Sequence, residues 1–197
     1  QSKAESRIGR PRDPKIDEGV LDATLAQLAE HGYARMTIDA VAAAAGVDKP
    51  SIYRRWPSKA DLATAALSQL QADEPPPVTR SPRKDLIALL SIFGQKLLRP
   101  NGMTMIGTLL VEETHNPELI ALFRERIVKR RRAMVHEVLE RAQSAGQLRR
   151  GADLEVAVNL LIGSFYARYL SGEKLPADWA ERVVTTVWDG ISATGRR

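Results

Sequence analysis

The sequence contains no cysteine and no long apolar run, and each absence excludes a class of protein. Without cysteine the chain can form no disulfide, no thiolate metal site and no cysteine nucleophile, which fits the reducing cytosol. No apolar run approaches the roughly 20 residues that a helix needs to cross a bilayer. The polar, basic N-terminus is not followed by the apolar core of a secretory signal. We therefore expect a cytoplasmic protein with no membrane partner.

The sequence also lacks the motifs of the common enzyme classes. Its three histidines, His31, His115 and His136, are scattered, and none has a nucleophile pattern nearby. The segment that begins at His136 lacks the second histidine of the zinc-protease helix. Neither a phosphate-binding loop nor a dinucleotide-binding fingerprint is present. The sequence therefore predicts a protein that is not an enzyme, with no catalytic residues, no cofactor and no metal site.

Basic residues are distributed unevenly, although the net charge of +5 is modest. Residues 1–12 contain four basic side chains and one acidic one, residues 46–59 have the same excess, and the segment between them is acidic. Two basic stretches on either side of an acidic helix predict a negatively charged partner, and a solvated charged surface is the alternative. A further basic run, 129–132, lies among glutamates and is predicted to be a salt-bridged solvent face.

Apolar residues recur at helical spacing along the whole chain, and no segment shows the alternation of a β-strand. Glycine and proline residues mark the breaks, and the consecutive prolines at 75–77 mark a module boundary. We therefore predict an all-α fold with a basic arm (1–12), a small helical module (13–72), a linker (73–82) and a larger bundle (83–197). The nine predicted helices cover about residues 14–31, 37–45, 48–55, 58–71, 82–98, 101–113, 117–145, 153–171 and 177–193.

Two short helices separated by a glycine turn predict a helix-turn-helix. Thr37 is a suitable N-cap for the first helix, and Gly46 lies in the turn. The second helix has Asp48 or Lys49 as its cap, and Pro50 lies in its first turn, where a missing N–H group costs nothing. In a helix-turn-helix, this second helix enters the major groove of DNA.

The stretch from Thr37 to Leu62 resembles the TetR (tetracycline-repressor-like) family at several coupled places. These are a turn of the type Ala-x-x-Ala-Gly-Val, the recognition helix Ser-Ile-Tyr-Arg-Arg-Trp, and the entry Pro-Ser-Lys-x-x-Leu into the following helix. The resemblance covers roughly residues 14–71. The rest of the chain resembles the family only in its helix count, its length and its lack of enzyme motifs.

The resemblance and the positions of the side chains predict the same DNA contacts. Lys49 lies at the start of the recognition helix, and Tyr53 offers a ring for a thymine methyl group and a hydroxyl for a phosphate. Thr37 and Lys59 lie at helix N-termini, which favour phosphate binding. The predicted DNA-binding residues are Arg10, Arg12, Thr37, Lys49, Pro50, Ser51, Tyr53, Arg54 and Lys59.

Some residues near this surface have alternative roles. An ion pair with the acidic first helix is the alternative to DNA contact for Arg55, and we assign Ile52 and Trp56 to the core. The arm residues Gly9 to Arg12 resemble an A·T-hook, which reads a narrow minor groove. A basic tail attracted only by charge is the alternative for the arm.

The resemblance implies that the larger bundle binds a small molecule. Apolar side chains at helical spacing are usually plain core, but this family typically keeps a cavity here, and methionines suit a deformable wall. An apolar or amphipathic ligand is expected, with Glu112, Glu113, His115 and Tyr166 as polar contacts. The predicted pocket residues are Phe93, Met103, Met105, Ile106, Leu109, Leu110, Glu113, Phe123, Ile127, Phe165 and Tyr166.

The last two long helices are predicted to form a homodimer. They carry more apolar surface than one packed stripe needs, and Gly163, Ser164 and Ala167 permit another helix to approach closely. An internally buried helix pair is the alternative. The predicted interface residues are Leu161, Phe165, Tyr169, Val184, Val187 and Trp188.

Together these features predict a sequence-specific DNA-binding transcriptional regulator. A homodimer is expected to read a palindromic operator in double-stranded DNA, because one helix-turn-helix contacts too few base pairs. We expect a repressor that a small apolar or amphipathic effector releases from its operator. An activator built from the same parts is the first alternative. A helical small-molecule-binding or interaction protein without DNA binding is the second.

Overall fold

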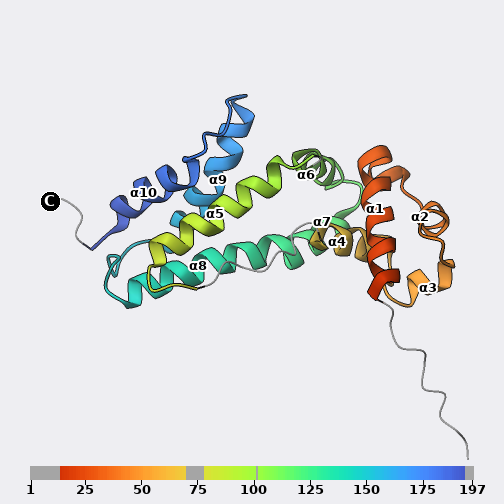
Figure 1. Ribbon diagram of the computed structural model, residues 1–197, viewed down its shortest axis with the longest axis horizontal. Coiled ribbons are helices and arrows are strands. Elements are labelled where there is room, and N and C mark those ends of the chain that lie inside the picture. The colour runs from red at the N-terminus through yellow and green to blue at the C-terminus, as the bar shows by residue number, and fades with distance from the viewer. Residues whose placement is uncertain (1–13, 70–77, 101, 194–197) are drawn as a thin grey trace, which may run out of the picture. The chain divides into compact units, whose positions relative to one another are not determined.

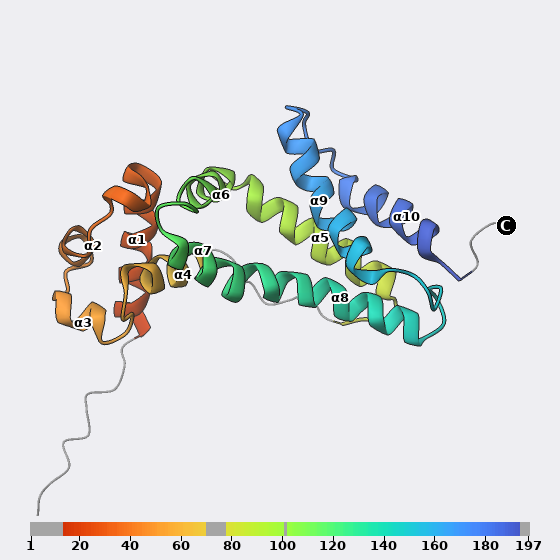
Figure 2. The ribbon, with the colours of Figure 1, turned by 180° about the vertical axis from the view of Figure 1, so that it is seen from behind.

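The computed structural model describes residues 14–69, 78–100 and 102–193, and helices dominate these ranges (Figures 1 and 2). No strand occurs among the described residues, where a single isolated bridge joins Leu148 to Ser192. The chain divides into two compact units, one that ends at Leu67 and one that begins at Ser68. The all-α class predicted from the sequence is confirmed.

The N-terminal unit consists of short helices around a small apolar core. The first helix loses helical dihedral angles at Gly32, whose φ is 72°, so it breaks where the sequence predicted its end, and a short extension follows. The boundary between the two units falls inside the fourth helix. The core contains Val20, Leu28, Met36, Val41, Ile52 and Leu62. The helices are α1 (Pro14–Arg35), α2 (Ile38–Ala45), α3 (Lys49–Tyr53) and α4 (Lys59–Gln69).

The C-terminal unit is a bundle of longer helices. The helix predicted over 117–145 is one uninterrupted helical stretch that includes a π-helical turn, η1. The α8–α9 connection and the end of α10 lie side by side, because backbone hydrogen bonds join Arg149 to Ile191 and Ala193 to Gln147. The elements are α5 (Pro82–Leu98), α6 (Gly102–Val111), α7 (Pro117–Phe123), η1 (Arg124–Val128), α8 (Lys129–Ser144), α9 (Leu154–Leu170) and α10 (Trp179–Ile191).

Aromatic side chains occupy the centre of this bundle. Phe165 of α9 is fully buried and meets Phe93 of α5 edge-on, with 5.4 Å between ring centroids. Trp179, at the start of α10, packs edge-on against the same ring at 5.8 Å. These contacts join α5, α9 and α10 through the large apolar area that aromatic rings bury.

One polar cluster fastens the start of α5 to α8. Asp85 is buried and accepts hydrogen bonds from the amide and hydroxyl groups of Thr79 and from Arg141, whose Nη2 lies 2.5 Å from a carboxylate oxygen. Burial alone would raise the pKa of the Asp85 carboxyl, but the bonds from Thr79 and Arg141 outweigh it and hold that pKa below its usual value.

We predict that Asp85→Asn destabilises the protein by about 2 kcal/mol at neutral pH, because Arg141 loses its charged partner. The folded-state pKa of Asp85 is depressed, so its contribution is present above the unfolded pKa of about 4 and is lost as pH falls through the folded pKa. The difference in the free energy of unfolding between wild type and variant should therefore be constant near neutral pH and decrease in acid. Denaturant unfolding at several pH values measures it, with the exposed Asp189→Asn as control. Equal stability of wild type and D85N at pH 7 would contradict the prediction.

Candidate nucleic-acid interface

The position of α3 follows from the turn before it and from one buried side chain. Gly46 adopts a left-handed conformation with φ of 66°, and the amide of Val47 returns to the carbonyl of Ala42 at 3.0 Å. Asp48 then caps α3 by accepting the amide hydrogen of Ser51 at 2.6 Å. Ile52 is 1% exposed and holds α3 in the core. This local geometry forms the predicted helix-turn-helix.

Lys49 and Tyr53 lie one helical turn apart and both are exposed, whereas Ile52 of the same helix is buried. Tyr53 has 45% of its surface exposed, so both its ring and its hydroxyl are accessible. Pro50 occupies the first turn of the same helix and is also exposed. The exposed side of α3 therefore offers a cation, a flat ring and a phenolic hydroxyl.

Lys49 is held by Asp39 of α2. The ammonium lies 2.9 Å from one carboxylate oxygen and donates to the other at 3.0 Å. The hydrogen bond with Asp39 raises the pKa of Lys49 above its ordinary value, so this side chain is protonated at neutral pH. The pair holds the lysine beside the start of α3 and places a carboxylate next to its ammonium group.

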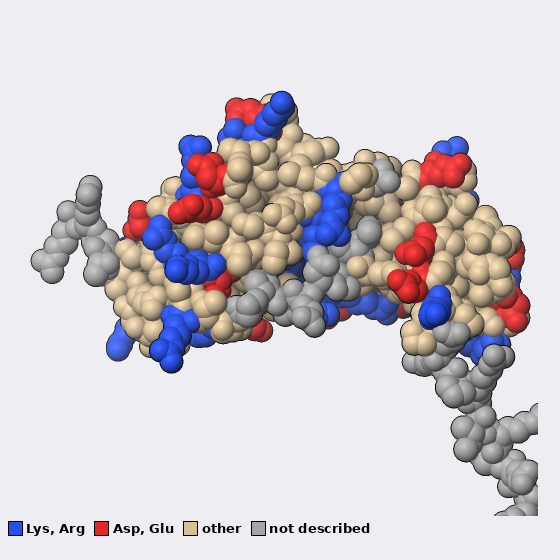
Figure 3. All heavy atoms as spheres, viewed as in Figure 1, with Lys and Arg blue, Asp and Glu red and all other residues tan. Residues whose placement is uncertain are grey.

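The arginines after Tyr53 have different partners. Arg54 is exposed and donates to the hydroxyl of Ser51 at 2.5 Å. Arg55 forms an ion pair with Asp17 of α1 and donates to the carbonyl of Ser51 at 3.1 Å. The predicted alternative for Arg55 is thus confirmed. Acidic side chains gather over α1 on the face shown in Figure 3.

The two residues predicted at other helix N-termini are both engaged within the unit. The exposed Thr37 caps α2, because its hydroxyl oxygen accepts the amide hydrogen of Ala40 at 3.1 Å. The Lys59 ammonium lies 4.4 Å from the centroid of the Tyr33 ring and donates to the carbonyl of Ala34 at 3.3 Å. Lys59 therefore ties the start of α4 to the end of α1.

Two other sequence assignments have clear outcomes. Ile52 lies in the core as predicted, whereas Trp56 is only partly buried, because it follows the last turn of α3 instead of lying within it. Arg10 and Arg12 lie outside the described residues, so the role of the arm stays a prediction.

The predicted pocket residues are divided between the interior and the surface of the bundle. Phe93, Phe165 and Tyr166 form one aromatic cluster with ring centroids 5.4 to 6.0 Å apart. Leu110 is 59% exposed and Glu113 is exposed, paired with Arg124 at 2.5 Å. Both therefore face solvent in this structure. Met105, Leu109 and Ile127 are buried, and Met103, Ile106 and Phe123 are partly buried.

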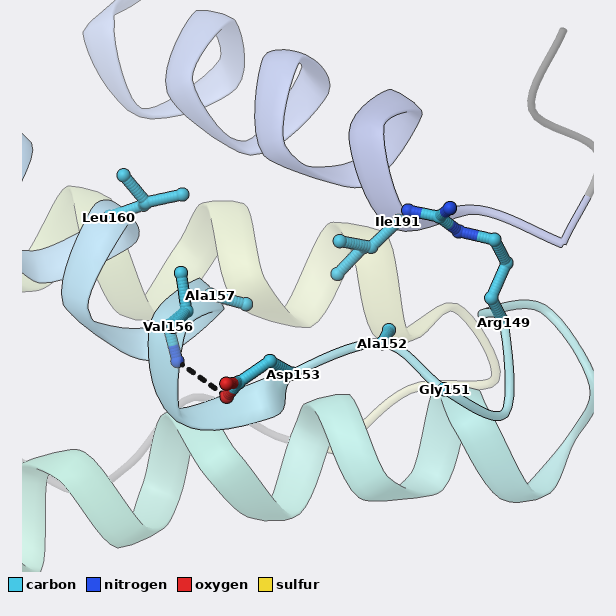
Figure 4. A pocket seen from close by; sticks show the side chains of 8 residues that line it. All are labelled: Arg149, Gly151, Ala152, Asp153, Val156, Ala157, Leu160 and Ile191. Carbon is cyan, nitrogen blue, oxygen red and sulfur yellow. Dashed lines mark hydrogen bonds between the residues drawn. The ribbon is translucent and has the colours of Figure 1, made fainter.

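A pocket of about 320 Å³ lies elsewhere in the bundle (Figure 4). It is formed by the α8–α9 connection, the first turns of α9 and the end of α10, and no predicted pocket residue lines it. Its only local sequence signal is the cap Asp153, which accepts the amide hydrogen of Val156 at 3.0 Å. The lining consists of Arg149, Gly151, Ala152, Asp153, Val156, Ala157, Leu160 and Ile191.

The predicted dimer residues also differ in exposure. Leu161, Phe165 and Val184 have no exposed surface within the single chain, so we correct their assignment to the subunit core, where a partner could not reach them. Tyr169 is 45% exposed, and Val187 and Trp188 are partly buried. Leu170, which the sequence placed on the apolar surface of this helix, is exposed, but sequence analysis missed the exposed apolar residues Val156 and Leu160 of α9.

The described ranges contain no metal-binding cluster and no membrane-spanning helix. No group of three or more His, Asp or Glu residues there could hold a metal ion. No helix in the same ranges is both long enough and apolar enough to span a membrane.

Comparisons with known proteins cover both units. The family described as bacterial regulatory proteins, tetR family, matches residues 20–66, and the tetracyclin repressor-like C-terminal domain matches residues 76–187. An uncharacterized HTH-type transcriptional regulator of Mycobacterium tuberculosis is 35% identical over 85% of this chain and 84% of its own length. The HTH-type transcriptional regulator AqdR of Rhodococcus erythropolis is 32% identical over 91% and 86%.

A solved structure is also similar to this chain. The crystal structure of the TetR family transcription regulator SCO0332 superposes with a TM-score of 0.68 at 31% identity, over 90% of this chain and 98% of that one. The capped helix-turn-helix, the helical bundle behind it and these relatives lead to one conclusion. The chain belongs to the TetR family and is a DNA-binding transcriptional regulator.

Proposed function

We propose that this regulator is a repressor that binds a palindromic operator as a homodimer and leaves it when a small apolar or amphipathic effector binds. The observation that carries the proposal is the exposed side of α3, where Lys49 and Tyr53 lie together on a helix fixed by Ile52. A protein without DNA binding would have no use for an exposed ring beside a cation at this position. Activation would use the same contacts, so transcription assays must determine the sign.

The proposed DNA contacts divide into base reading and phosphate anchoring. Tyr53 and Pro50 can meet thymine methyl groups, and Lys49 can reach a guanine edge or a phosphate. Ser51, Arg54, Thr37 and Lys59 are proposed to anchor phosphates, the last two through the N-terminal amides of α2 and α4. Arg10 and Arg12 are proposed to extend the contact into the minor groove.

The proposed dimer uses the exposed apolar side of α9. Val156, Leu160, Gly163, Ala167 and Leu170 recur at spacings of three and four residues, which places them on one side of the helix. Gly163 and Ala167 are small and permit close approach of a partner helix. Tyr169, Val187 and Trp188 extend this surface. A twofold pair would set the two α3 helices about 34–36 Å apart, one turn of duplex.

The proposed effector site is the aromatic and methionine-rich interior of the bundle, around Phe93, Met103, Met105, Phe165 and Tyr166. A ligand can shift the equilibrium between two conformations of a regulator only if it binds one conformation more tightly than the other. α4 carries the chain from the DNA-reading unit into the bundle. A change of bundle packing that alters the spacing of the two α3 helices would lower operator affinity.

We predict that Lys49→Ala and Tyr53→Ala each weaken operator binding by about tenfold or more, because each removes a contact from the reading surface. K49A should also reduce the salt dependence by about one unit of slope per subunit. Gel shifts with the DNA upstream of the protein's own gene, at several salt concentrations, measure both effects. Transcription in vitro from the same DNA should fall when wild type is added.

The matched control for this charge change is Lys84→Ala, an exposed lysine of α5 in the other unit. K84A should bind operator as wild type does. Unchanged affinity of both K49A and Y53A would refute the proposed reading surface.

We further predict that Asp39→Asn tightens operator binding by about two- to fivefold, the size of an exposed charge interaction. The substitution releases Lys49 from its ion pair and removes a carboxylate that repels phosphate. The gain should diminish as salt rises, because exposed charges are screened. Weaker binding by D39N would show that Asp39 positions Lys49 for DNA instead of competing with it.

We also predict that Leu160→Glu converts the homodimer into a monomer, because a charge would be buried in the proposed interface. Analytical ultracentrifugation measures the mass, and operator affinity should fall together with dimerisation. Val111→Glu, at an equally apolar position of α6 that is 74% exposed, is the control and should stay dimeric. A dimeric L160E protein would place the interface elsewhere.

A further inference from the structure

The basic run on α8 contains two partly buried arginines, Arg131 and Arg132, and the two have different partners. Lys129 pairs with Glu125, and Arg132 pairs with Glu155 at 2.6 Å and donates to Asn159 at 2.7 Å. Arg131 lies between Ile127 and Val135 at intervals of four residues, and both of those side chains are buried. Residues four apart lie on the same side of a helix, so Arg131, which is itself partly buried, lies on the inner side of α8.

The surroundings of Arg131 are aromatic. Its guanidinium carbon lies 4.6 Å from the centroid of the Phe93 ring on α5. The ring of Tyr166 on α9 meets Phe93 edge-on at 6.0 Å, and its hydroxyl lies near enough to Arg131 for the two groups to shift each other's pKa. Burial lowers the pKa of Arg131 and raises that of Tyr166, so both polar groups lie in a poorly hydrated place.

This arginine has no carboxylate partner among the described residues, in contrast to Lys129 and Arg132. In place of a carboxylate, the partly buried guanidinium of Arg131 has the Phe93 ring and the nearby Tyr166 hydroxyl as neighbours. Removing a charge from water is costly unless an opposite charge compensates it. The π-helical turn η1 ends at Val128, directly before this run, and such turns are frequent at functional sites.

We infer that Arg131 binds the carboxylate of an effector whose apolar or aromatic part packs among Phe93, Phe165 and Tyr166. The planar guanidinium can donate two parallel hydrogen bonds to a carboxylate, and the Tyr166 hydroxyl can donate a third. The aromatic rings supply the wall for the apolar part. This inference rests on the proposed effector-binding role of the bundle and assigns to it one chemical class, a carboxylic acid with an apolar skeleton.

The test compares acids with amides of the same shape. Decanoate and naphthalene-2-carboxylate are titrated into the full-length protein by calorimetry, each beside its carboxamide. At least one carboxylate should bind about tenfold or more tightly than its amide, as expected for a charge-assisted pair. Arg131→Met should lose this preference. The matched control Arg132→Met removes the neighbouring arginine of the same run and should keep it.

A second variant covers the case in which R131M does not fold. Arg131→Lys keeps the charge but loses the planar fork, so its preference for the carboxylate should be reduced and still present. Circular dichroism verifies folding. The inference is overturned if neither acid is preferred over its amide by wild type, or if the preference survives in R131M. No DNA is present in the calorimeter, so a failure here leaves the gel-shift test of the reading surface unaffected, and the reverse also holds.

Discussion

The proposed DNA recognition depends on the fixed orientation of α3, a helix of only five residues. A segment so short has no stability by itself, since helix nucleation is unfavourable and each added residue contributes little. Its neighbours therefore hold it: Ile52 is buried beneath it, Asp48 caps its start, and Arg55 joins its end to Asp17. The acidic character of α1 is part of this arrangement, because a carboxylate there retains Arg55 within the unit and leaves Lys49 and Tyr53 for the DNA.

The partners of the cations distinguish structural roles from proposed functional ones. Arg141, Arg55 and Arg132 each meet a carboxylate at close range and hold two helices together. Lys49 also has a carboxylate, but the pair is exposed, and an exposed pair is weak enough to exchange for a phosphate. Arg131 lies instead over the Phe93 ring and near the Tyr166 hydroxyl, and its proposed partner is the carboxylate of an effector.

Local signals made the reading unit predictable from sequence. The left-handed turn favours glycine at position 46, and the start of α3 favours a capping side chain such as that of Asp48. Apolar residues at helical spacing indicate the helices themselves. Each of these signals acts within a few residues. The interior of the bundle depends on contacts between distant segments. Helical spacing placed Leu161, Phe165 and Val184 on apolar faces, but could not tell a face packed inside the subunit from one left exposed, as at Leu160. The whole charged run 129–132 was likewise predicted to be one solvent face, although Arg131 lies four residues from each of the core residues Ile127 and Val135.

α9 offers a physical link between the proposed effector site and the proposed dimer. Its inner side carries Phe165 and Tyr166 of the aromatic cluster, and its outer side carries Leu160 and Leu170. A helix transmits displacement because its backbone hydrogen bonds make it stiff along its axis. A carboxylate between Arg131 and Tyr166 would draw α8 and α9 together and move both sides of α9 at once. Operator DNA would favour the opposite arrangement of these helices. Because linkage is reciprocal, DNA must then lower the affinity for the carboxylate ligand by the same factor by which the ligand lowers the affinity for DNA.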